Sequence, residues 1–139
     1  MIPPYGLPLQ SQIFSPGCLN LDQIRLLEEL GRKRSDIEKI FSYSFLIDER
    51  NKKGELIGFA GVTNRYFVFK TVFLAVKKEY QGKGIGLKLF DKLWVLQQKK
   101  PWVTVWKNNL AALKIYQNYY YFIPYRKGKL LGLPKGVIT

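Results

Sequence analysis

Histidine is absent from this chain of 139 residues, and cysteine occurs once, at position 18. A single cysteine permits no disulfide within the chain, and without histidine we expect no metal site of the zinc type. This composition favours a reducing, cytoplasmic setting. No apolar stretch approaches the ~20 residues that a membrane span requires. The first residues, Met1 to Tyr5, carry no basic side chain before an apolar block, so we expect no signal peptide.

Acidic residues are scarce after position 50. Residues 1–50 hold six basic and seven acidic side chains, whereas residues 51–139 hold 17 basic ones and three acids, Glu55, Glu79 and Asp91. The two parts therefore carry −1 and +14, which give the +13 of the whole chain. Such an excess is typical of proteins with an anionic ligand, an acidic partner or nucleic acid, and it also occurs as a simple aid to solubility.

The remaining composition is that of a folded protein. Hydrophobic residues make up 47% of the chain and aromatic residues 15%, which excludes a disordered chain and suits one domain with a real core. Neither repeats nor low-complexity segments occur. We therefore expect a single domain over residues 1–139, with an irregular segment over residues 1–8, where three of the seven prolines lie.

Apolar periodicity predicts strands and helices in alternation. In the first helix, Leu21, Ile24, Leu27 and Glu28 share one face, and Asn20 is the expected cap. A polar turn over 51–54 predicts a hairpin between the second and third of the main strands. The expected strands are 10–14, 43–48, 55–62, 66–76, 102–106, 121–125 and 129–133, and the expected helices are 21–30, 35–41, 87–96 and 110–118.

The stretch 71–96 predicts a strand, a glycine loop and a helix in succession. An apolar run over 72–76 suits a strand buried on both faces, and after Gly86 the apolar residues recur at helical spacing. The first amides of a helix lack intrahelical partners, and the helix dipole adds positive charge there. Glycines admit a ligand to these amides and Lys83 adds a full charge, so the stretch predicts a phosphate site.

The glycine spacing limits which phosphate ligand fits. A Walker loop and a dinucleotide fingerprint both fail, because neither spacing is met and no acid follows in the next strand. The spacing Q/R-x-x-G-x-G/A is met by Gln81, Gly84 and Gly86. This loop resembles the pyrophosphate loop of the GCN5-related N-acetyltransferases, which bind acetyl-coenzyme A. An ordinary glycine-rich turn is the alternative interpretation.

A second motif lies about 25 residues further on. Family members carry an asparagine after the fifth strand, an alanine three residues later and a tyrosine seven residues later, which Asn109, Ala112 and Tyr116 match. Without this spacing, the three residues would be a helix cap and core packing. Four residues after the tyrosine, where the family usually has glycine, this chain has Tyr120, so the helix must end without a left-handed glycine.

The resemblance implies a fold and a reaction. The fold is an α/β domain with a mixed, mostly antiparallel central sheet of six to seven strands, helices on both faces, and splayed parallel fourth and fifth strands. The reaction is transfer of an acetyl group to a primary amine by direct attack within a ternary complex. Tyr116 would be the general acid; the implied cofactor-binding residues are Leu74, Ala75, Val76, Gln81, Gly82, Lys83, Gly84, Ile85, Gly86, Asn109 and Ala112.

The general base and the acceptor are harder to predict. Some family members place a glutamate where this chain has Lys70, and Glu55 and Glu79 are expected to be surface groups. A water chain or an already neutral amine are the alternatives. Because acids are few after position 50, we expect a neutral or acidic amine-bearing small molecule, or a protein N-terminus or lysine beside acidic residues.

Two other functions stay open at this point. The basic half, with Tyr66, Phe67 and Phe69 among its basic residues, would also suit a nucleic-acid-binding module. A relative that binds coenzyme A without efficient turnover is the other alternative, because no base is evident.

Overall fold

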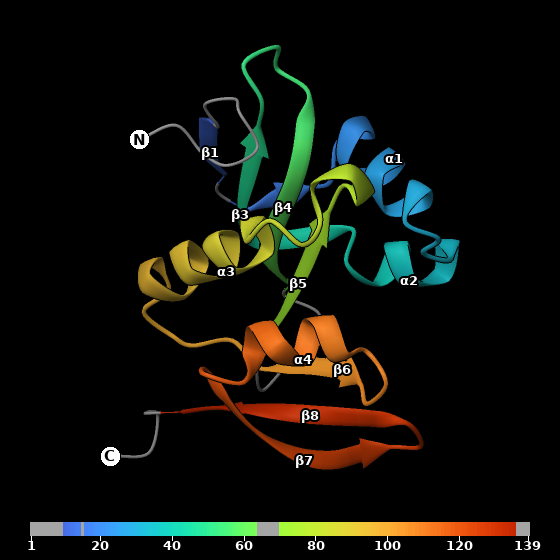
Figure 1. The fold of residues 1–139 in the computed structure, drawn as a ribbon, viewed down its shortest axis with the longest axis vertical. Helices are drawn as coiled ribbons and strands as arrows, with labels where there is room; N and C mark the ends of the chain where they lie inside the picture. The colour runs from blue at the N-terminus through green and yellow to red at the C-terminus, as the bar shows by residue number, and fades with distance from the viewer. Residues whose placement is uncertain (1–9, 15, 64–69, 136–139) are drawn as a thin grey trace.

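The computed structural model describes residues 10–14, 16–63 and 70–135 (Figure 1). The described part holds four α-helices, one 3-10 turn and eight strands. The helices are α1 (Leu21–Glu29), α2 (Arg34–Lys39), α3 (Ile85–Leu96) and α4 (Leu110–Tyr116), and the 3-10 turn η1 is Lys78–Tyr80. The strands are β1 (Gln10–Phe14), β2 (Gly17–Cys18), β3 (Ser42–Arg50), β4 (Leu56–Thr63), β5 (Thr71–Val76), β6 (Val103–Trp106), β7 (Tyr120–Arg126) and β8 (Lys129–Pro134).

The strands form two antiparallel sheets rather than one. The first sheet has the order β1-β3-β4-β5, with β2 also pairing with β3, and the second has the order β6-β8-β7. One parallel bridge, between Thr71 and Trp102, joins them. It is closed by hydrogen bonds of 2.9 Å from the Val72 amide to the Trp102 carbonyl and of 2.7 Å from the Trp102 amide to the Lys70 carbonyl. The expected splay of two parallel strands is therefore confirmed, and the expected single sheet of six to seven strands is divided at this point.

Two clusters of buried side chains lie on opposite faces of the first sheet. The α3-side core joins α3 residues such as Leu89 and Phe90 to Val103 and Tyr120 of the second sheet. The α1-side core packs α1 and α2 residues such as Leu27 and Ile37 against the other face. Side chains alternate between the two faces of a strand, which explains why β3, β4 and β5 are buried on both sides. The predicted helices on both faces are confirmed.

The start of α1 follows the prediction, but its buried face does not. Asn20 forms a capping box with Gln23, whose backbone amide donates to the Asn20 side chain at 3.0 Å. The predicted face of Leu21, Ile24, Leu27 and Glu28 is wrong in part, because Leu21 is 60% exposed and Glu28 is also exposed. The buried residues are Gln23, Leu26 and Leu27. The capping box turns Gln23 inward, where its side chain also donates to Asp48 at 3.5 Å.

The other predicted elements differ mainly at their ends. The hairpin of β3 and β4 forms with the register Asp48 opposite Phe59. Of the strand expected over 66–76, residues 71–76 form β5 and Lys70 precedes it; positions 66–69 lie outside the described residues, as do 1–9, 64 and 65. Helix α4 ends at Tyr116, and its C-cap Gln117 is right-handed. Tyr120 stands in place of the family's glycine, is 2% exposed and donates to the Pro101 carbonyl at 2.9 Å.

A buried ion pair joins α3 to β3, near the β1 edge of the first sheet. The Glu49 carboxylate is fully buried in β3, and its Oε1 accepts from Ser11 at 2.5 Å and pairs with Lys92 of α3 at 2.7 Å. Lys92→Met should lower the free energy of unfolding by roughly 2–4 kcal/mol, because it leaves a buried carboxylate without its cation. Chemical denaturation measures this loss. Lys88→Met, at an exposed position of the same helix, should stay within ~0.5 kcal/mol; equal effects of the two would contradict a structural role for the pair.

Candidate functional site

A cleft of about 1320 Å³ opens where β5 and β6 diverge. Its walls are Leu74 and Val76 on β5, Val103 and Val105 on β6, and residues of α4 on one face and of the α1–α2 segment on the other. Because the walls come from elements on both faces of the sheet, the cleft passes between the two sheets from one face to the other. It is therefore a gap between the two sheets. The gap exists because the bridge between Thr71 and Trp102 is not continued by further pairing of β5 with β6.

Backbone groups of β5 face this gap without a strand to pair with. The Val72 amide donates toward β6, whereas the Lys77 amide donates to Ile57 of β4. Successive residues of a strand direct their hydrogen-bonding groups to opposite sides, so Leu74 and Val76 face the gap with Val72. Beyond the bridge at Thr71, no described residue of β6 pairs with β5. The amides of Leu74 and Val76 and the Leu74 carbonyl are thus open to a ligand, whereas the Val76 carbonyl accepts from the Gln81 side chain.

The glycine loop lies at the end of β5 and leads into α3. Gly82 and Gly84 line the cleft with φ values of 77° and 82°, a left-handed backbone that favours glycine. Gly84 is also the N-cap of α3 and supplies no side chain to cap the helix, so the first amides of a twelve-residue helix remain available. A Cβ at Gly86 would approach Ile115 of α4 to 3.0 Å. This glycine lets α3 and α4 lie close together beside the loop.

The remaining predicted donor-site residues of this region divide into two groups. Gln81 lines the cleft, and its side-chain amide donates to the Val76 carbonyl at 2.9 Å, which fixes the loop to the end of β5. Ala75, Lys83 and Ile85 do not line it. Ala75 faces the α1-side core and Ile85 the α3-side core, and exposed Lys83 lies over the Tyr80 ring, 5.8 Å from its centroid.

The second motif brings its three residues to the opposite wall of the cleft. Asn109 caps α4, its side-chain oxygen accepting from the Ala112 amide at 3.2 Å. Ala112 and Tyr116 follow on the same helix, and all three line the cleft. Tyr116 is 4% exposed, and its ring packs edge-on against Phe90 and Tyr120, with centroids 5.1 and 5.7 Å away. The tyrosine is therefore part of the core and of the cleft wall at once.

Tyr116 lines the cleft although its side chain is enclosed in the core. Burial raises the pKa of Tyr116 well above its ordinary value, and the positive charge of Arg32 acts in the opposite direction. The hydroxyl therefore keeps its proton over the whole physiological range and lies within the field of a residue from the α1–α2 segment.

Sequence reasoning missed the residues on the far side of the cleft. Arg32, Lys33 and Lys39 come from the α1–α2 segment, and Arg126 and Lys129 from the β7–β8 hairpin. No motif connects these distant positions, although the basic excess was visible. Of the acids considered for the base, Glu55 and Glu79 are exposed, as predicted, and lie outside the cleft wall. Asp36 is the one carboxylate among the described residues that line it.

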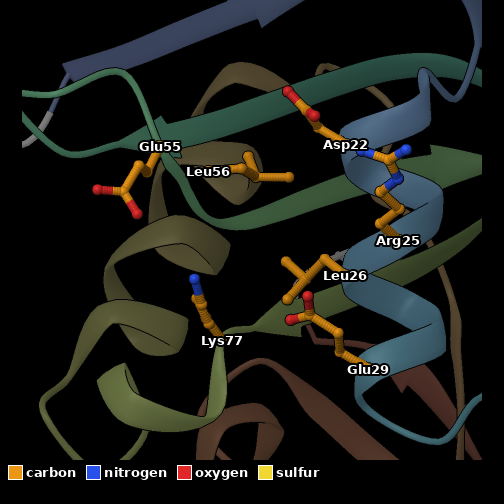
Figure 2. Close-up of a pocket in the computed structure, with 7 residues that line it drawn as sticks. All are labelled: Asp22, Arg25, Leu26, Glu29, Glu55, Leu56 and Lys77. Atoms are coloured by element: carbon orange, nitrogen blue, oxygen red, sulfur yellow. The ribbon is translucent and has the colours of Figure 1, made fainter.

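A smaller hollow of about 360 Å³ lies between α1 and the adjoining ends of β4 and β5. Figure 2 shows α1 side chains along one wall, with Glu55 and Lys77 across from them. The hollow shares no lining residue with the cleft and contains none of the predicted site residues. Its mixed acids and bases match no feature of the predicted chemistry, so the cleft is the candidate site.

Two further findings concern metals and membranes. In residues 10–14, 16–63 and 70–135, no three His, Cys, Asp or Glu side chains gather in a way that would hold a metal ion. Nor does this described part contain a helix of the length and apolar character that crossing a membrane takes.

Comparison with known proteins identifies the family. Residues 42–121 match the acetyltransferase (GNAT) domain. This match covers more than half of the chain, and the chain therefore belongs to the GNAT family of acetyltransferases, which use acetyl-coenzyme A. No curated protein matches the sequence.

Solved structures with the same fold agree. The catalytic domain of Tetrahymena GCN5 histone acetyltransferase, in complex with coenzyme A, has a TM-score of 0.64 at 18% identity, over 94% of this chain and 95% of that one. The ribosomal-protein-S18-alanine N-acetyltransferase from Escherichia coli has a TM-score of 0.60 at 17% identity, over 94% of this chain and 97% of that one. The IAA acetyltransferase from Bacillus cereus has a TM-score of 0.59 at 16% identity, over 91% of this chain and 100% of that one. At these identities the likeness concerns the fold alone.

Proposed function

We propose that this chain, as a single domain over residues 1–139, transfers an acetyl group from acetyl-coenzyme A to a primary amine. The observation that carries the proposal is the coincidence, in one cleft, of an open strand edge on β5, a glycine loop at a helix N-terminus, and the Tyr116 hydroxyl. These are the parts needed to hold an extended arm, to bind its pyrophosphate, and to protonate a leaving thiolate.

The glycine loop fits a pyrophosphate. Gly82 and Gly84 have no atom within 4 Å of a Cβ position, so the space in front of the loop is open to an anion. The uncapped amides at the start of α3 and the positive end of its dipole favour negative charge there. The exposed Lys83 adds positive charge beside the loop, and Gln81 holds the loop against β5. Ala75, Lys83 and Ile85 would therefore support the site from outside the cleft wall.

The chemistry at the other end follows from β5 and α4. The thioester supplies an activated acyl group. Amides of Leu74 or Val76 would donate to its carbonyl oxygen as negative charge develops there. As the amine nitrogen forms its bond to the carbonyl carbon and the carbon–sulfur bond breaks, Tyr116 would donate its proton to the departing sulfur. The proton that the attacking nitrogen loses would pass to water, and the Tyr116 oxygen would recover from water the proton that it donated. Positioning both reactants in one cleft supplies much of the rate.

The scarcity of carboxylates in the cleft has a kinetic consequence. With Asp36 as the one carboxylate among the described lining residues, the amine should have to lose its proton before it attacks. Turnover, as kcat/KM, should then rise with pH toward the pKa of the free amine, about 7.7–8.0 for an N-terminus and about 10.4 for a lysine. A pH–rate profile on two peptides that differ only in the type of amine measures this. One profile shared by both peptides, levelling off near ~6, would instead indicate a base on the protein.

Two measurements test the proposal against its alternatives. Thermal shifts with acetyl-coenzyme A, and with single-stranded and duplex nucleic acid, compare the ligands, because the true ligand at 100 times its Kd stabilises by about 2.7 kcal/mol. Release of coenzyme A thiol with a panel of amines then reports turnover. Stabilisation by acetyl-coenzyme A with amine-dependent thiol release supports the transferase. Stabilisation without release would leave a silent relative, and stabilisation by nucleic acid alone would favour the binding module.

A further inference from the structure

Five of the basic side chains that line the cleft come from segments other than the glycine loop and α4. Arg32, Lys33 and Lys39 come from the α1–α2 segment, and Arg126 and Lys129 from the β7–β8 hairpin. We call these five residues the basic rim. Four of them are exposed and Lys129 is half-buried. They come from two segments that are far apart in the sequence, and they line one cleft only because of the fold.

The glycine loop is the proposed site for the phosphates of the acyl donor, and the α1–α2 part of the basic rim lies on the opposite face of the first sheet. The glycine loop begins α3, which packs on one face of the first sheet, whereas α1 and α2 cover the other face. Lys83 and Lys114 are the cations nearer the loop and α4. The charge of the α1–α2 segment is therefore left for whatever enters from the other face. In a direct transfer, that is the acceptor.

This positive charge has almost no internal compensation. The charged side chains that line the cleft are six basic and one acidic, a net +5 over the described residues. The acid, Asp36, pairs with Lys39 at 3.8 Å. Arg32 and Lys33 form no ion pair with any residue that the structure describes. An uncompensated cluster of one sign raises the local concentration of ligands of the opposite sign.

Aromatic rings hold the hairpin part of the rim in place. Lys129 Nζ lies 4.8 Å from the centroid of Trp106, and the guanidinium carbon of Arg126 lies 5.3 Å from that of Tyr125. Such cation–π contacts position the charge without neutralising it. Trp106 is 53% exposed and Tyr125 is 37% exposed, so flat apolar surface lies next to the cations. This combination suits a chain of alternating charge and apolar contacts better than a small compact ion.

Arg32 of the rim and Tyr116 line the same cleft. The positive charge of Arg32 also acts against the rise that burial causes in the pKa of the Tyr116 hydroxyl. An acceptor amine placed near this hydroxyl would have its neighbouring groups, rather than the amine itself, against the rim.

From this arrangement we propose that the acceptor is an acidic peptide segment, whose amine is flanked within a few residues by carboxylates that the basic rim binds. The inference rests on the proposed function and adds the class of acceptor. Carboxylates would contact Arg32 and Lys33 on one side and Arg126 on the other, while a polyamine or a lysine-rich segment would be repelled from the opening.

Peptides that differ only in the charge of the residues after the amine provide the test. Three peptides with the same N-terminal residue, followed by acidic, neutral or basic side chains, are compared by release of coenzyme A thiol at low and high salt. The acidic peptide should have a kcat/KM on the order of tenfold above that of the neutral peptide, because its KM is lower. High salt should reduce this difference in kcat/KM. Equal rates for all three, or preference for the basic peptide, would overturn the proposal.

A charge-reversal variant locates the effect. Arg32→Glu with Arg126→Glu should remove or invert the preference, while the KM for acetyl-coenzyme A stays within about twofold because the glycine loop is on the other face. Lys52→Glu, at an exposed position of the β3–β4 turn outside the cleft, is the matched control and should keep the preference. A preference unchanged by the double variant would show that the rim does not read the acceptor.

The outcomes separate this inference from the function beneath it. Thiol release with neutral or basic peptides only would leave the transferase and remove the acidic acceptor. No release with any peptide, together with no stabilisation by acetyl-coenzyme A, would remove both. A short single-stranded oligonucleotide is added as a competitor. If it displaces the acidic peptide at equal charge concentration far more strongly than a poly-glutamate peptide does, the rim is a nucleic-acid surface and the peptide assignment fails.

Discussion

Gly84→Val is expected to abolish measurable binding of acetyl-coenzyme A. Gly84 has φ +82°, a conformation that a β-branched residue rarely adopts, and it caps α3 where the open amides begin. Valine would shift this backbone and place methyl groups in front of the amides. Charge-assisted hydrogen bonds contribute about 1.5–3 kcal/mol each, so the loss of two corresponds to roughly a 10²–10⁴-fold higher Kd. Isothermal calorimetry measures it.

The chain offers a close control for backbone strain. Gly54 has φ +84° and, like Gly84, no atom within 4 Å of a Cβ position, but it lies in the β3–β4 turn outside the cleft. Gly54→Val should cost a comparable amount of stability, about 1–2 kcal/mol, and leave the Kd unchanged. If Gly84→Val bound acetyl-coenzyme A with the parent affinity, the loop would not be part of the donor site.

Tyr116→Phe is expected to lower kcat about 10²-fold, within the usual range for loss of a general acid. The ring stays and keeps its packing against Phe90 and Tyr120, and the change removes only the hydroxyl. Stability and the Kd for acetyl-coenzyme A should therefore remain near those of the parent. Steady-state kinetics with a saturating acceptor, alongside chemical denaturation, measure both properties.

The neighbouring tyrosine distinguishes catalysis from packing. Tyr120 is equally buried, but its hydroxyl donates to the Pro101 carbonyl at 2.9 Å and Tyr120 does not line the cleft. Tyr120→Phe should cost about 1–3 kcal/mol of stability, because a buried acceptor loses its donor, and should leave kcat within about twofold. A Tyr116→Phe variant with parental kcat would remove Tyr116 from the mechanism and leave it as a core residue.

The Tyr116 proton also bears on the alkaline side of the rate profile. Burial raises the pKa of Tyr116 above its ordinary value near 10. A raised pKa keeps the neutral, proton-donating form over a wider range, so loss of this proton should cause no decline of activity below pH ~10. Any decline in that range would therefore have another origin.

The local elements were largely predictable because their signals are local. The capping box at Asn20, the polar turn after β3, and the change from strand to helical spacing around Gly86 each depend on a few consecutive residues. The buried face of α1 was not predictable in the same way. Two phases of its apolar pattern were possible, and in the structure Leu26 and Leu27 pack against the first sheet with Gln23 beside Asp48 of β3. Contacts of that kind belong to the tertiary fold and leave no mark in the helix itself.

The division of the sheet had a similar cause. The sequence predicts that β5 and β6 run parallel, but it does not indicate that their pairing stops after one bridge at Thr71 and Trp102. Two compact motifs predicted residues that the structure brings to one cleft, whereas Ala75, Lys83 and Ile85 lie off the cleft wall. The basic rim escaped prediction because its residues are about 90 positions apart, and a charge excess alone does not say where charges meet.

The open edge of β5 has a consequence for the behaviour of the protein in concentrated solution. Its six residues, Thr71–Val76, are rich in β-branched and aromatic side chains and contain no charge, proline or glycine, which is the composition of segments that stack into fibrils. A free edge on such a strand ordinarily invites pairing with another molecule. Here the edge faces an internal gap walled by β6 and α4, and Lys70, Lys77 and Lys78 stand at its two ends. Because the edge is enclosed and flanked by charge, this aggregation-prone strand can stay unpaired without pairing with strands of neighbouring molecules.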